Sequence, residues 1–291
     1  MDEPAALRMI GDRLDVAGDD AAVVGDLVIT TDMLHERTDF PNGVSRYTAG
    51  WRAVGASLSD VAAMGAETLA AVAVYAAPRF DEAELTEFLD GAVDVCAAVG
   101  ARYVGGDLDT HDEFTVASTA VGRTDRPVFR SGASPGDRVY VTGQFGESAA
   151  GLACFRAGDI ERGNDLFQFT PRVAAGLALA PVATAMIDSS DGLARSLHQL
   201  AHASDVGFDI RWDAVPVAQA VDTLAEDESV RREWGLHFGE DFELVVTAPP
   251  DRVDSVRSTV DVAITEIGEV TESGVSIDGT PLPDEGYSHG R

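Results

Sequence analysis

The sequence predicts two domains of mixed helix and strand, of the α/β or α+β class. Strand and helix patterns alternate in both halves of the 291-residue chain, which is long enough for two cores. A segment at residues 126–137, RPVFRSGASPGD, separates the halves, and its two prolines and two glycines interrupt regular structure. We therefore expect one domain over residues 1–135 and a second over residues 136–291.

Apolar residues at helical or strand spacing define the elements of each half. In the first half we expect helices over 5–14, 45–64 and 82–99, and strands over 27–31, 69–76, 102–105 and 114–122. In the second half we expect strands over 138–142, 185–187 and 242–247, a helix that begins near residue 147, and helices over 193–203 and 250–260.

The composition is that of a folded globular protein, with 45% hydrophobic and 24% charged residues. No apolar run is long enough to span a bilayer, and the opening residues MDEP lack the basic start of a signal peptide. We expect a cytoplasmic protein that does not bind membranes. Cys96 and Cys154 lie in alanine-rich apolar segments, which favours two buried hydrophobic residues over a disulfide, a zinc site or a nucleophile.

The formal net charge is -29, and all 21 basic residues are arginine. Such a surface repels nucleic acid and anionic lipid. It suits a protein that works in concentrated salt, where charges are screened, so we expect a halophilic source. That hypothesis fails if the protein is fully stable and active without added salt. Because a Walker A loop requires lysine, the absence of lysine excludes a P-loop.

Acids that interrupt apolar or glycine-rich segments are informative, because an ionised carboxylate that leaves water must be paired or bind a metal. Asp19 and Asp20 stand in the small-residue segment AGDDAAVV, for which a solvated acidic turn is the alternative. Thr30, Thr31 and Asp32 end a predicted strand, where hydroxyl and carboxylate oxygens are suitable ligands for a hard cation.

Two further segments carry an acid within the first half. Asp60 interrupts an otherwise apolar helix, a poor fit for a solvated face. Asp107 follows Gly105 and Gly106 at the end of a strand, and glycines there allow close approach of the backbone to a phosphate. The alternative for this segment is a glycine turn with an incidental acid.

The second half has an acid-rich bend between a strand and a helix. Asp188, Ser190 and Asp191 lie in this bend, although Ser190 or Asp191 alone could be a helix N-cap. Glu240 and Asp241 stand before another strand. Because these ligands are all oxygens and no Cys/His cluster accompanies them, the implied metal is Mg²⁺.

Carboxylates around several Mg²⁺ ions, with glycines nearby, indicate chemistry on a polyphosphate. Arg130, in the segment RPVFRSG, is then a candidate for bidentate phosphate binding, and an ordinary linker arginine is the alternative.

The order and wording of these motifs resemble the thiamine-monophosphate kinase family, within the superfamily of aminoimidazole ribonucleotide synthetase. The LSDVAAMGA segment is the most specific, and the resemblance covers nearly the whole chain. The matching segments are GDDAA at 18–22, TTDML at 30–34, LSDVAAMGA at 58–66, GGD at 105–107, RSGA at 130–133, DSSDGL at 188–193 and GEDFEL at 239–244.

The resemblance implies an N-terminal α/β domain whose strands form a barrel with those of a second subunit in a homodimer, and a C-terminal α+β domain. It implies direct in-line transfer from ATP to thiamine monophosphate, with ATP in a cleft between the domains and without a phospho-enzyme or a side-chain base. The implied Mg²⁺ ligands are Asp20, Thr30, Thr31, Asp32, Asp60, Asp107, Asp188 and Asp191. The implied ATP contacts are Gly106, Asp107, Arg130 and Ser190, and the implied thiamine contacts are Glu240 and Tyr287.

Two departures from the family pattern affect the acceptor pocket. Asp39 occupies the place where many members have a substrate-contacting histidine, and Phe238 precedes Gly239-Glu240-Asp241 where relatives have a second glycine. We assign Asp39 to the acceptor pocket. His35 and Arg37 are the alternative residues for the role of that histidine, and an ordinary surface position is the alternative for His35. The alternatives are a superfamily enzyme that uses ATP on another acceptor, as aminoimidazole ribonucleotide synthetase does, and a nucleotide-binding relative without turnover.

Overall fold

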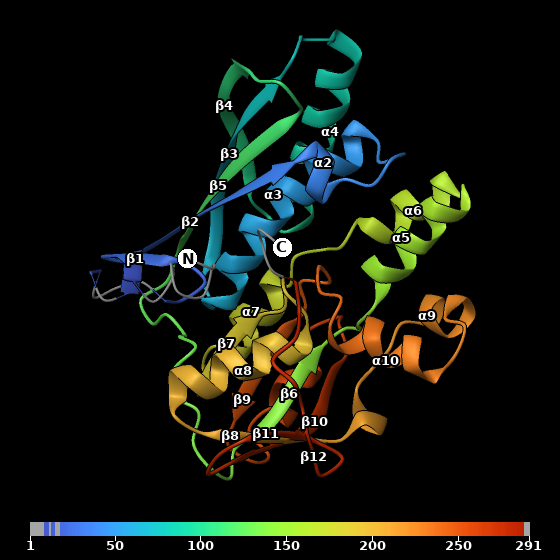
Figure 1. The fold of residues 1–291 in the computed structure, drawn as a ribbon. Coiled ribbons are helices and arrows are strands. Elements are labelled where there is room, and N and C mark those ends of the chain that lie inside the picture. The colour runs from blue at the N-terminus through green and yellow to red at the C-terminus, as the bar shows by residue number, and fades with distance from the viewer. Residues whose placement is uncertain (1–8, 12, 15–17, 288–291) are drawn as a thin grey trace.

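Two β-sheets and their covering helices make up the computed structural model, which describes residues 9–11, 13–14 and 18–287 (Figure 1). Only residues 9–11 and 13–14 of the helix expected over 5–14 are described, and residues 9–11 are helical. No helix in the described ranges has both the length and the apolar character needed to cross a bilayer. The predicted mixture of α/β and α+β architecture is confirmed.

The first half forms a five-stranded sheet in the order β1-β2-β5-β3-β4, in which only β3 and β4 are parallel. Helices α3 (Arg46–Ala63) and α4 (Glu82–Ala98) pack on one face of the sheet, and the short α2 (Glu36–Asp39) follows β2. The strands are β1 (Ala22–Val24), β2 (Leu27–His35), β3 (Glu67–Ala77), β4 (Arg102–Thr110) and β5 (Thr115–Arg123).

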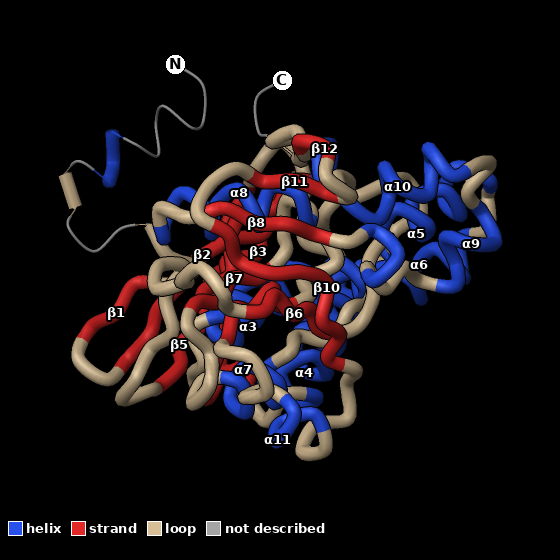
Figure 2. The backbone as a smooth tube through the Cα atoms, turned by 90° about the horizontal axis from the view of Figure 1, so that it is seen from below, coloured by secondary structure: helices blue, strands red, loops and turns tan. Residues whose placement is uncertain are grey.

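The second half forms a seven-stranded sheet in the order β12-β11-β8-β10-β6-β9-β7, and only β8 and β11 are parallel (Figure 2). Its strands are β6 (Arg138–Thr142), β7 (Ala185–Asp188), β8 (Gly207–Ile210), β9 (Leu244–Ala248), β10 (Ile264–Thr271), β11 (Val275–Ile277) and β12 (Thr280–Pro281). Its helices are α5 (Glu147–Ala157), α6 (Ile160–Phe167), α7 (Val173–Leu179), α8 (Leu193–Ser204), α9 (Gln219–Leu224), α10 (Glu228–Leu236) and α11 (Asp254–Arg257), with a 3₁₀ turn at Trp212–Ala214.

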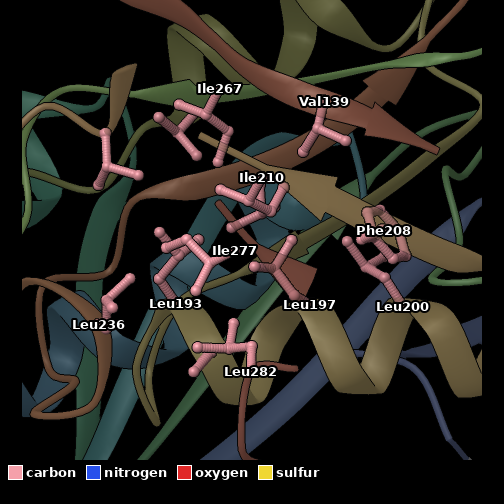
Figure 3. Close-up of a cluster of buried hydrophobic side chains, with 14 of the residues drawn as sticks. Val139, Leu193, Leu197, Leu200, Phe208, Ile210, Leu236, Ile267, Ile277 and Leu282 are labelled. Carbon is pink, nitrogen blue, oxygen red and sulfur yellow. The ribbon is translucent and has the colours of Figure 1, made fainter. Parts of the chain in front are cut away.

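Both faces of the seven-stranded sheet are covered by helices. On one face, α8 inserts Leu193, Leu197 and Leu200 against Phe208 and Ile210 (Figure 3). On the other face, α7, α11 and the end of α3 complete a second core. Each fully buried leucine contributes about 1.5–3 kcal/mol, so this sheet is stabilised within a single chain.

The five-stranded sheet keeps one face open. Strands β2 and β3 alternate between side chains packed on α3 and α4 and side chains on the opposite face, and Tyr103 is the residue of β4 that packs against this core. That opposite face, which we call the open face, includes Ile29, Met33, Val72, Val74 and Val104, and each is 36–55% exposed. A contiguous apolar face of this kind is typical of an interaction surface.

Helix α3 lies between the two sheets and contacts β2, β3, β5, α7 and β7 (Figure 1). Its close packing on α4 requires glycine: a Cβ at Gly50 would lie 2.2 Å from Phe88 O, and one at Gly91 would lie 2.0 Å from Tyr47 O. Ser45 begins the helix by accepting a hydrogen bond from Thr48 N at 3.0 Å. Helix α3 can therefore connect groups from the two halves.

Several expected elements differ in extent. The strand expected over 27–31 continues to His35 in β2, and the strand expected over 102–105 continues to Thr110 in β4, so Asp32 and Asp107 lie within strands and not at strand ends. The helix expected over 250–260 is wrong in length, because only Asp254–Arg257 is helical and Asp251 has a positive φ of 65°. The strand expected from residue 242 begins at Leu244, since Phe242 has a φ of 53° that does not fit a strand.

Candidate active site

Three aspartates from distant parts of the sequence meet between the two sheets. Asp20 precedes β1, Asp60 stands in the last turn of α3, and Asp188 ends β7. A carboxylate oxygen of each lies within 4.8 Å of one from each of the others. Asp20 and Asp188 are only 8% and 3% exposed. We call these three residues the buried acid cluster.

Two residues of β2 extend the buried acid cluster. Thr30 Oγ1 donates a hydrogen bond to Asp60 Oδ2 at 2.5 Å. Ser57 Oγ donates to Asp32 Oδ2 at 2.7 Å and lies 2.7 Å from Ser118 Oγ. Both Thr30 and Asp32 alternate toward α3 and so face the cluster, but they lie within β2, which continues to His35, and not at the predicted strand end.

The protonation of the cluster reflects lost hydration and like charges. Burial raises the pKa of Asp60 well above its usual range, and the charges of Asp32 and Asp188 raise it further. Burial, followed by the charge of Asp20, raises the pKa of Asp188 to about 8. Burial also raises the pKa of Asp32. Crowded carboxylates of this kind are stabilised as anions only when a cation joins them.

The donor set fits a hard divalent cation. All the groups that converge are carboxylate or hydroxyl oxygens, the ligands that Mg²⁺ and Ca²⁺ prefer. Asp188 Oδ2 is buried and has no hydrogen-bond partner among the described residues. A buried carboxylate oxygen without a partner is costly, and a bound cation would remove that cost.

Arg130 borders the cluster and forms hydrogen bonds with Asp19 and Asp20. The guanidinium contacts Asp20 through Nε at 3.3 Å and Nη2 at 2.9 Å, and the backbone N of Arg130 donates to Asp19 Oδ1 at 2.7 Å. Burial opposes the positive charge, but the Asp20 carboxylate more than compensates, so the pKa of Arg130 is raised. The fork of this arginine therefore lies where a phosphate group near the cluster would meet it.

A second group of predicted residues, which we call the aromatic acid group, consists of Asp39, Glu240 and Tyr287. Tyr287 Oη donates to Asp39 Oδ1 at 3.4 Å. Burial, followed by the charges of Asp39 and Glu240, raises the pKa of Tyr287 to about 12. The backbone N atoms of Glu240 and Tyr287 donate to Ser190 O at 2.6 Å and Asp191 O at 3.2 Å. The 188–191 bend therefore joins this group to the buried acid cluster.

Three predicted residues lie apart from both groups. Thr31 points to the open face of its sheet, where its hydroxyl donates to Ser118 O at 2.8 Å. Gly106 and Asp107 lie on the exposed edge strand β4. A Cβ at Gly106 would lie 1.7 Å from Ala73 O, so pairing of β3 with β4 already requires this glycine.

The pairing of residues across the sheet shows how many strand-to-strand steps separate Asp107 from Asp32. Asp32 lies opposite Ser118, Ser118 opposite Ala73, and Ala73 opposite Gly106. Three steps between strands of about 4.8 Å each separate β2 from β4 by about 14 Å. Within one chain, Asp107 is therefore too distant to share a cation with Asp32.

Comparisons with known proteins identify relatives of this chain. Residues 18–124 match the family model described as AIR synthase related protein, N-terminal domain, and residues 134–278 match the corresponding C-terminal domain. The chain is 59% identical over 291 residues to the thiamine-monophosphate kinase of Halobacterium salinarum, covering 99% of this chain and 100% of that protein. It is 40% identical to the thiamine-monophosphate kinase of Methanospirillum hungatei, with 94% of each chain covered.

The chain belongs to the thiamine-monophosphate kinase family.

Solved structures extend the comparison to the arrangement of the domains. A structure described as AaThiL complexed with AMPPCP and TMP superposes with a TM-score of 0.90 at 28% identity, covering 99% of this chain and 97% of that one. The thiamine-monophosphate kinase of Stenotrophomonas maltophilia gives a TM-score of 0.83, also at 28% identity, covering 95% of this chain and 96% of that one. Hydrogenase maturation protein HypE, at 19% identity and a TM-score of 0.70, covering 90% of this chain and 86% of that one, shares the fold.

Two residues at the site had no predicted role. Arg52 is buried on α3 and contacts Glu240. The rule that identified Asp60, a charge in an apolar helix, could have identified it. Asp241 is buried and accepts hydrogen bonds from Gly146 N and Ser148 N. Burial raises the pKa of Asp241 to about 7. Nothing in the sequence distinguishes this inward carboxylate from Glu240 beside it.

Proposed function

We propose that this chain transfers the terminal phosphoryl group of ATP to thiamine monophosphate, forming thiamine diphosphate and ADP. The observation that carries the proposal is the convergence of Asp20, Asp60 and Asp188 from both halves of a member of this family. The related protein solved with AMPPCP and TMP supports ATP and thiamine monophosphate as the substrate pair.

We infer that Mg²⁺ ions bind at the buried acid cluster. They would supply positive charge that neutralises the triphosphate and the charge developing during transfer. The crowded carboxylates and the partnerless Asp188 Oδ2 support this inference. The proposed ligands are Asp20, Thr30, Thr31, Asp32, Asp60, Asp107, Asp188 and Asp191.

Other residues of the chain would position the triphosphate of ATP. Arg130 stands beside the cluster with its guanidinium held by Asp20, where it can orient the triphosphate. Ser190 and Gly106 are the other proposed ATP contacts. No side-chain base is needed for in-line transfer, because an oxygen of the acceptor phosphate is already ionised near neutral pH.

The aromatic acid group is the proposed site for the thiamine part of the acceptor. The thiazolium ring of thiamine carries a permanent positive charge. Asp39 and Glu240 offer negative charge, and Tyr287 offers a half-buried aromatic ring that can stack on a cationic ring. Since the 188–191 bend joins this group to the buried acid cluster, the acceptor phosphate can face the nucleotide.

We further propose a homodimer in which the open face is covered and each site is completed by Asp107 of the partner subunit. The sheet has two available edges: β4, and β2 beyond Ile29, where pairing with β1 ends. Pairing of β4 with this edge of β2 in a second copy would close an eight-stranded barrel around the apolar open face and bring Asp107 of the partner subunit beside Thr31 and Asp32. The domain division at residues 135 and 136 and the cleft between domains remain part of this proposal.

The test is an assay of product. The protein is incubated with Mg²⁺, ATP and thiamine monophosphate in concentrated salt, and thiamine diphosphate and ADP are measured together. We expect the two products in equal amounts. ADP and product from aminoimidazole precursors, without thiamine diphosphate, would instead support the synthetase-like alternative. Nucleotide binding without either product would support a relative that has lost turnover.

A further inference from the structure

Arg52 is a buried arginine on α3 that contacts Glu240 of the proposed acceptor site. Its side chain is 2% exposed. Nη1 donates to Phe167 O at 2.6 Å, and Nη2 donates to Glu240 Oε2 at 2.5 Å and to Glu240 O at 3.3 Å. Because a buried guanidinium needs a hydrogen-bonded carboxylate, Arg52 and Glu240 form one unit.

Aromatic rings fix the orientation of the guanidinium. Its central carbon lies 4.4 Å from the ring centre of Phe167 and 5.4 Å from that of Phe169. Phe242 lies 5.8 Å away and stacks on Phe169 with ring centres 4.1 Å apart. A planar guanidinium among rings has few alternative orientations, so the direction of its hydrogen bonds to Glu240 is set by packing.

The backbone of the Glu240 loop is also held in an uncommon conformation. Glu240 and Phe242 have φ angles of 63° and 53°, in the left-handed region that non-glycine residues rarely adopt. Such conformations persist when the surroundings determine them, and they concentrate at functional sites. Ser148 Oγ donates to Glu240 O at 2.7 Å, and Phe242 N donates to Ser189 O at 3.1 Å. The loop therefore depends on contacts that include Arg52.

One helix links this loop to the buried acid cluster. Arg52 and Asp60 are eight residues apart on α3, which corresponds to about 12 Å along the helix axis. Asp60 belongs to the end of the site where phosphates would bind, whereas Arg52 sets the position of Glu240 at the other end. Because α3 is a rigid spacer, it fixes the separation between the two ends.

We propose that Arg52 is a positioning residue for the acceptor. It directs the Glu240 carboxylate so that Oε2 is held by the protein while Oε1, which accepts no hydrogen bond within the described part of the chain, receives an N–H group of the acceptor. Its place on α3 sets this contact at the correct distance from the transferring phosphate. The inference rests on the proposed function.

The experiment is a double-mutant cycle on the full-length protein with steady-state kinetics in concentrated salt. Arg52→Met raises the KM for thiamine monophosphate by about tenfold and leaves the KM for ATP unchanged. Glu240→Gln has a similar effect, and the double variant is little worse than Glu240→Gln alone, because Arg52 acts through Glu240. Arg52→Lys retains the charge and gives a smaller increase in acceptor KM.

Arg231→Met is the matched control. Arg231 lies 5.2 Å from the Trp212 ring centre and pairs with Asp222 at 2.8 Å, so the substitution also removes an arginine that is both stacked and paired. We expect its KM values to equal those of the wild type. If Arg52→Met does not unfold cooperatively, Arg52→Lys takes its place in the cycle.

Three outcomes would overturn the inference. Equal effects on both substrates, or additive effects of the two substitutions, would indicate a merely structural role for Arg52. An unchanged acceptor KM in an active, folded Arg52 variant would remove Arg52 from acceptor binding while leaving the proposed function intact. A wild-type protein that neither binds thiamine monophosphate by calorimetry nor forms thiamine diphosphate would overturn the proposed function and this inference together.

Discussion

The buried acid cluster and the aromatic acid group differ in the partners that their carboxylates have. In the buried acid cluster, Asp20, Asp60 and Asp188 crowd together, and burial with mutual repulsion raises the pKa values of Asp60 and Asp188. In the aromatic acid group, Glu240 pairs with Arg52, and Asp39 accepts hydrogen bonds from neighbouring groups. In the first group Arg130 pairs with Asp20 alone, and Asp60 and Asp188 form no ion pair within the described part of the chain, whereas protein donors compensate the second group.

Because of this difference, we expect only the buried acid cluster to depend on metal. A cluster in which one carboxylate oxygen lacks any partner among the described residues requires external cations to become fully ionised. A group whose acids already have hydrogen-bond donors is preorganised without them. Substitutions in the first group should therefore abolish transfer, and those in the second should mainly weaken acceptor binding.

The largest effect is expected from Asp60→Asn. We expect transfer to fall by more than about a thousandfold, because cations at the cluster carry most of the charge stabilisation. The same substitution removes one of several repelling carboxylates, so the Tm of the metal-free protein should rise by about 2–6 °C. Kinetics and thermal unfolding with EDTA measure both.

Asp213→Asn is the control for this prediction, since Asp213 is exposed and lies outside the cluster. It should change neither rate nor Tm. Retained activity in Asp60→Asn would remove Asp60 from the metal site, and a lower Tm in EDTA would contradict the picture of repelling carboxylates.

The next prediction asks whether the proposed metal site, which includes Asp107, is complete within one chain. Asp60→Asn and Asp107→Asn should each be inactive as homodimers. If Asp107 acts in the site of its partner, a refolded equimolar mixture should recover about a quarter of wild-type activity, because half the dimers are mixed and each has one intact site. Activity assays on the mixture measure this recovery, and no recovery would place Asp107 in the site of its own chain.

A smaller effect is expected in the aromatic acid group. Asp39→Asn should raise the KM for thiamine monophosphate about tenfold and leave the KM for ATP and the Mg²⁺ dependence unchanged, since Asp39 supplies charge to the acceptor side alone. Steady-state kinetics with each substrate varied separately would test this. A shift in Mg²⁺ dependence would instead connect Asp39 to the cation sites and erase the distinction between the two groups.

Much of the fold could be predicted because its long elements have strong periodicity. Helices α3 and α4 match the expected ranges within one residue at each end. Strands β8, β10, β11 and β12 were missed, and β11 (Val275–Ile277) and β12 have too few residues for a pattern. Pairing across the sheet, not local preference, makes these residues strands.

The candidate site was predictable in its residue types and less so in its geometry. Burial of a carboxylate in an apolar segment identified Asp60 and Asp188, which the structure brings together. The sequence could not show that Asp107 lies about 14 Å from Asp32, because that distance depends on strand order in the sheet. Arg52 was missed because only tertiary packing reveals its carboxylate partner.

The smallest predicted effect concerns Asp241, a buried acid outside both groups. Burial raises the pKa of Asp241 from an ordinary value of 3.8 to about 7. At a pH between 3.8 and about 7, the folded protein therefore keeps a proton on Asp241 that the unfolded chain has released. The contribution of Asp241 to the free energy of unfolding is fully present below about pH 4 and is lost as the pH rises through about 7. In concentrated salt with Mg²⁺, the Tm of the wild type should therefore fall between pH 5 and pH 7 by about 4 °C more than that of Asp241→Asn. The quantity to compare is the slope of Tm against pH. The asparagine variant loses one of the hydrogen bonds from Gly146 N and Ser148 N at every pH, and this loss lowers its Tm without changing the slope. Parallel slopes would mean that Asp241 stays ionised throughout this range.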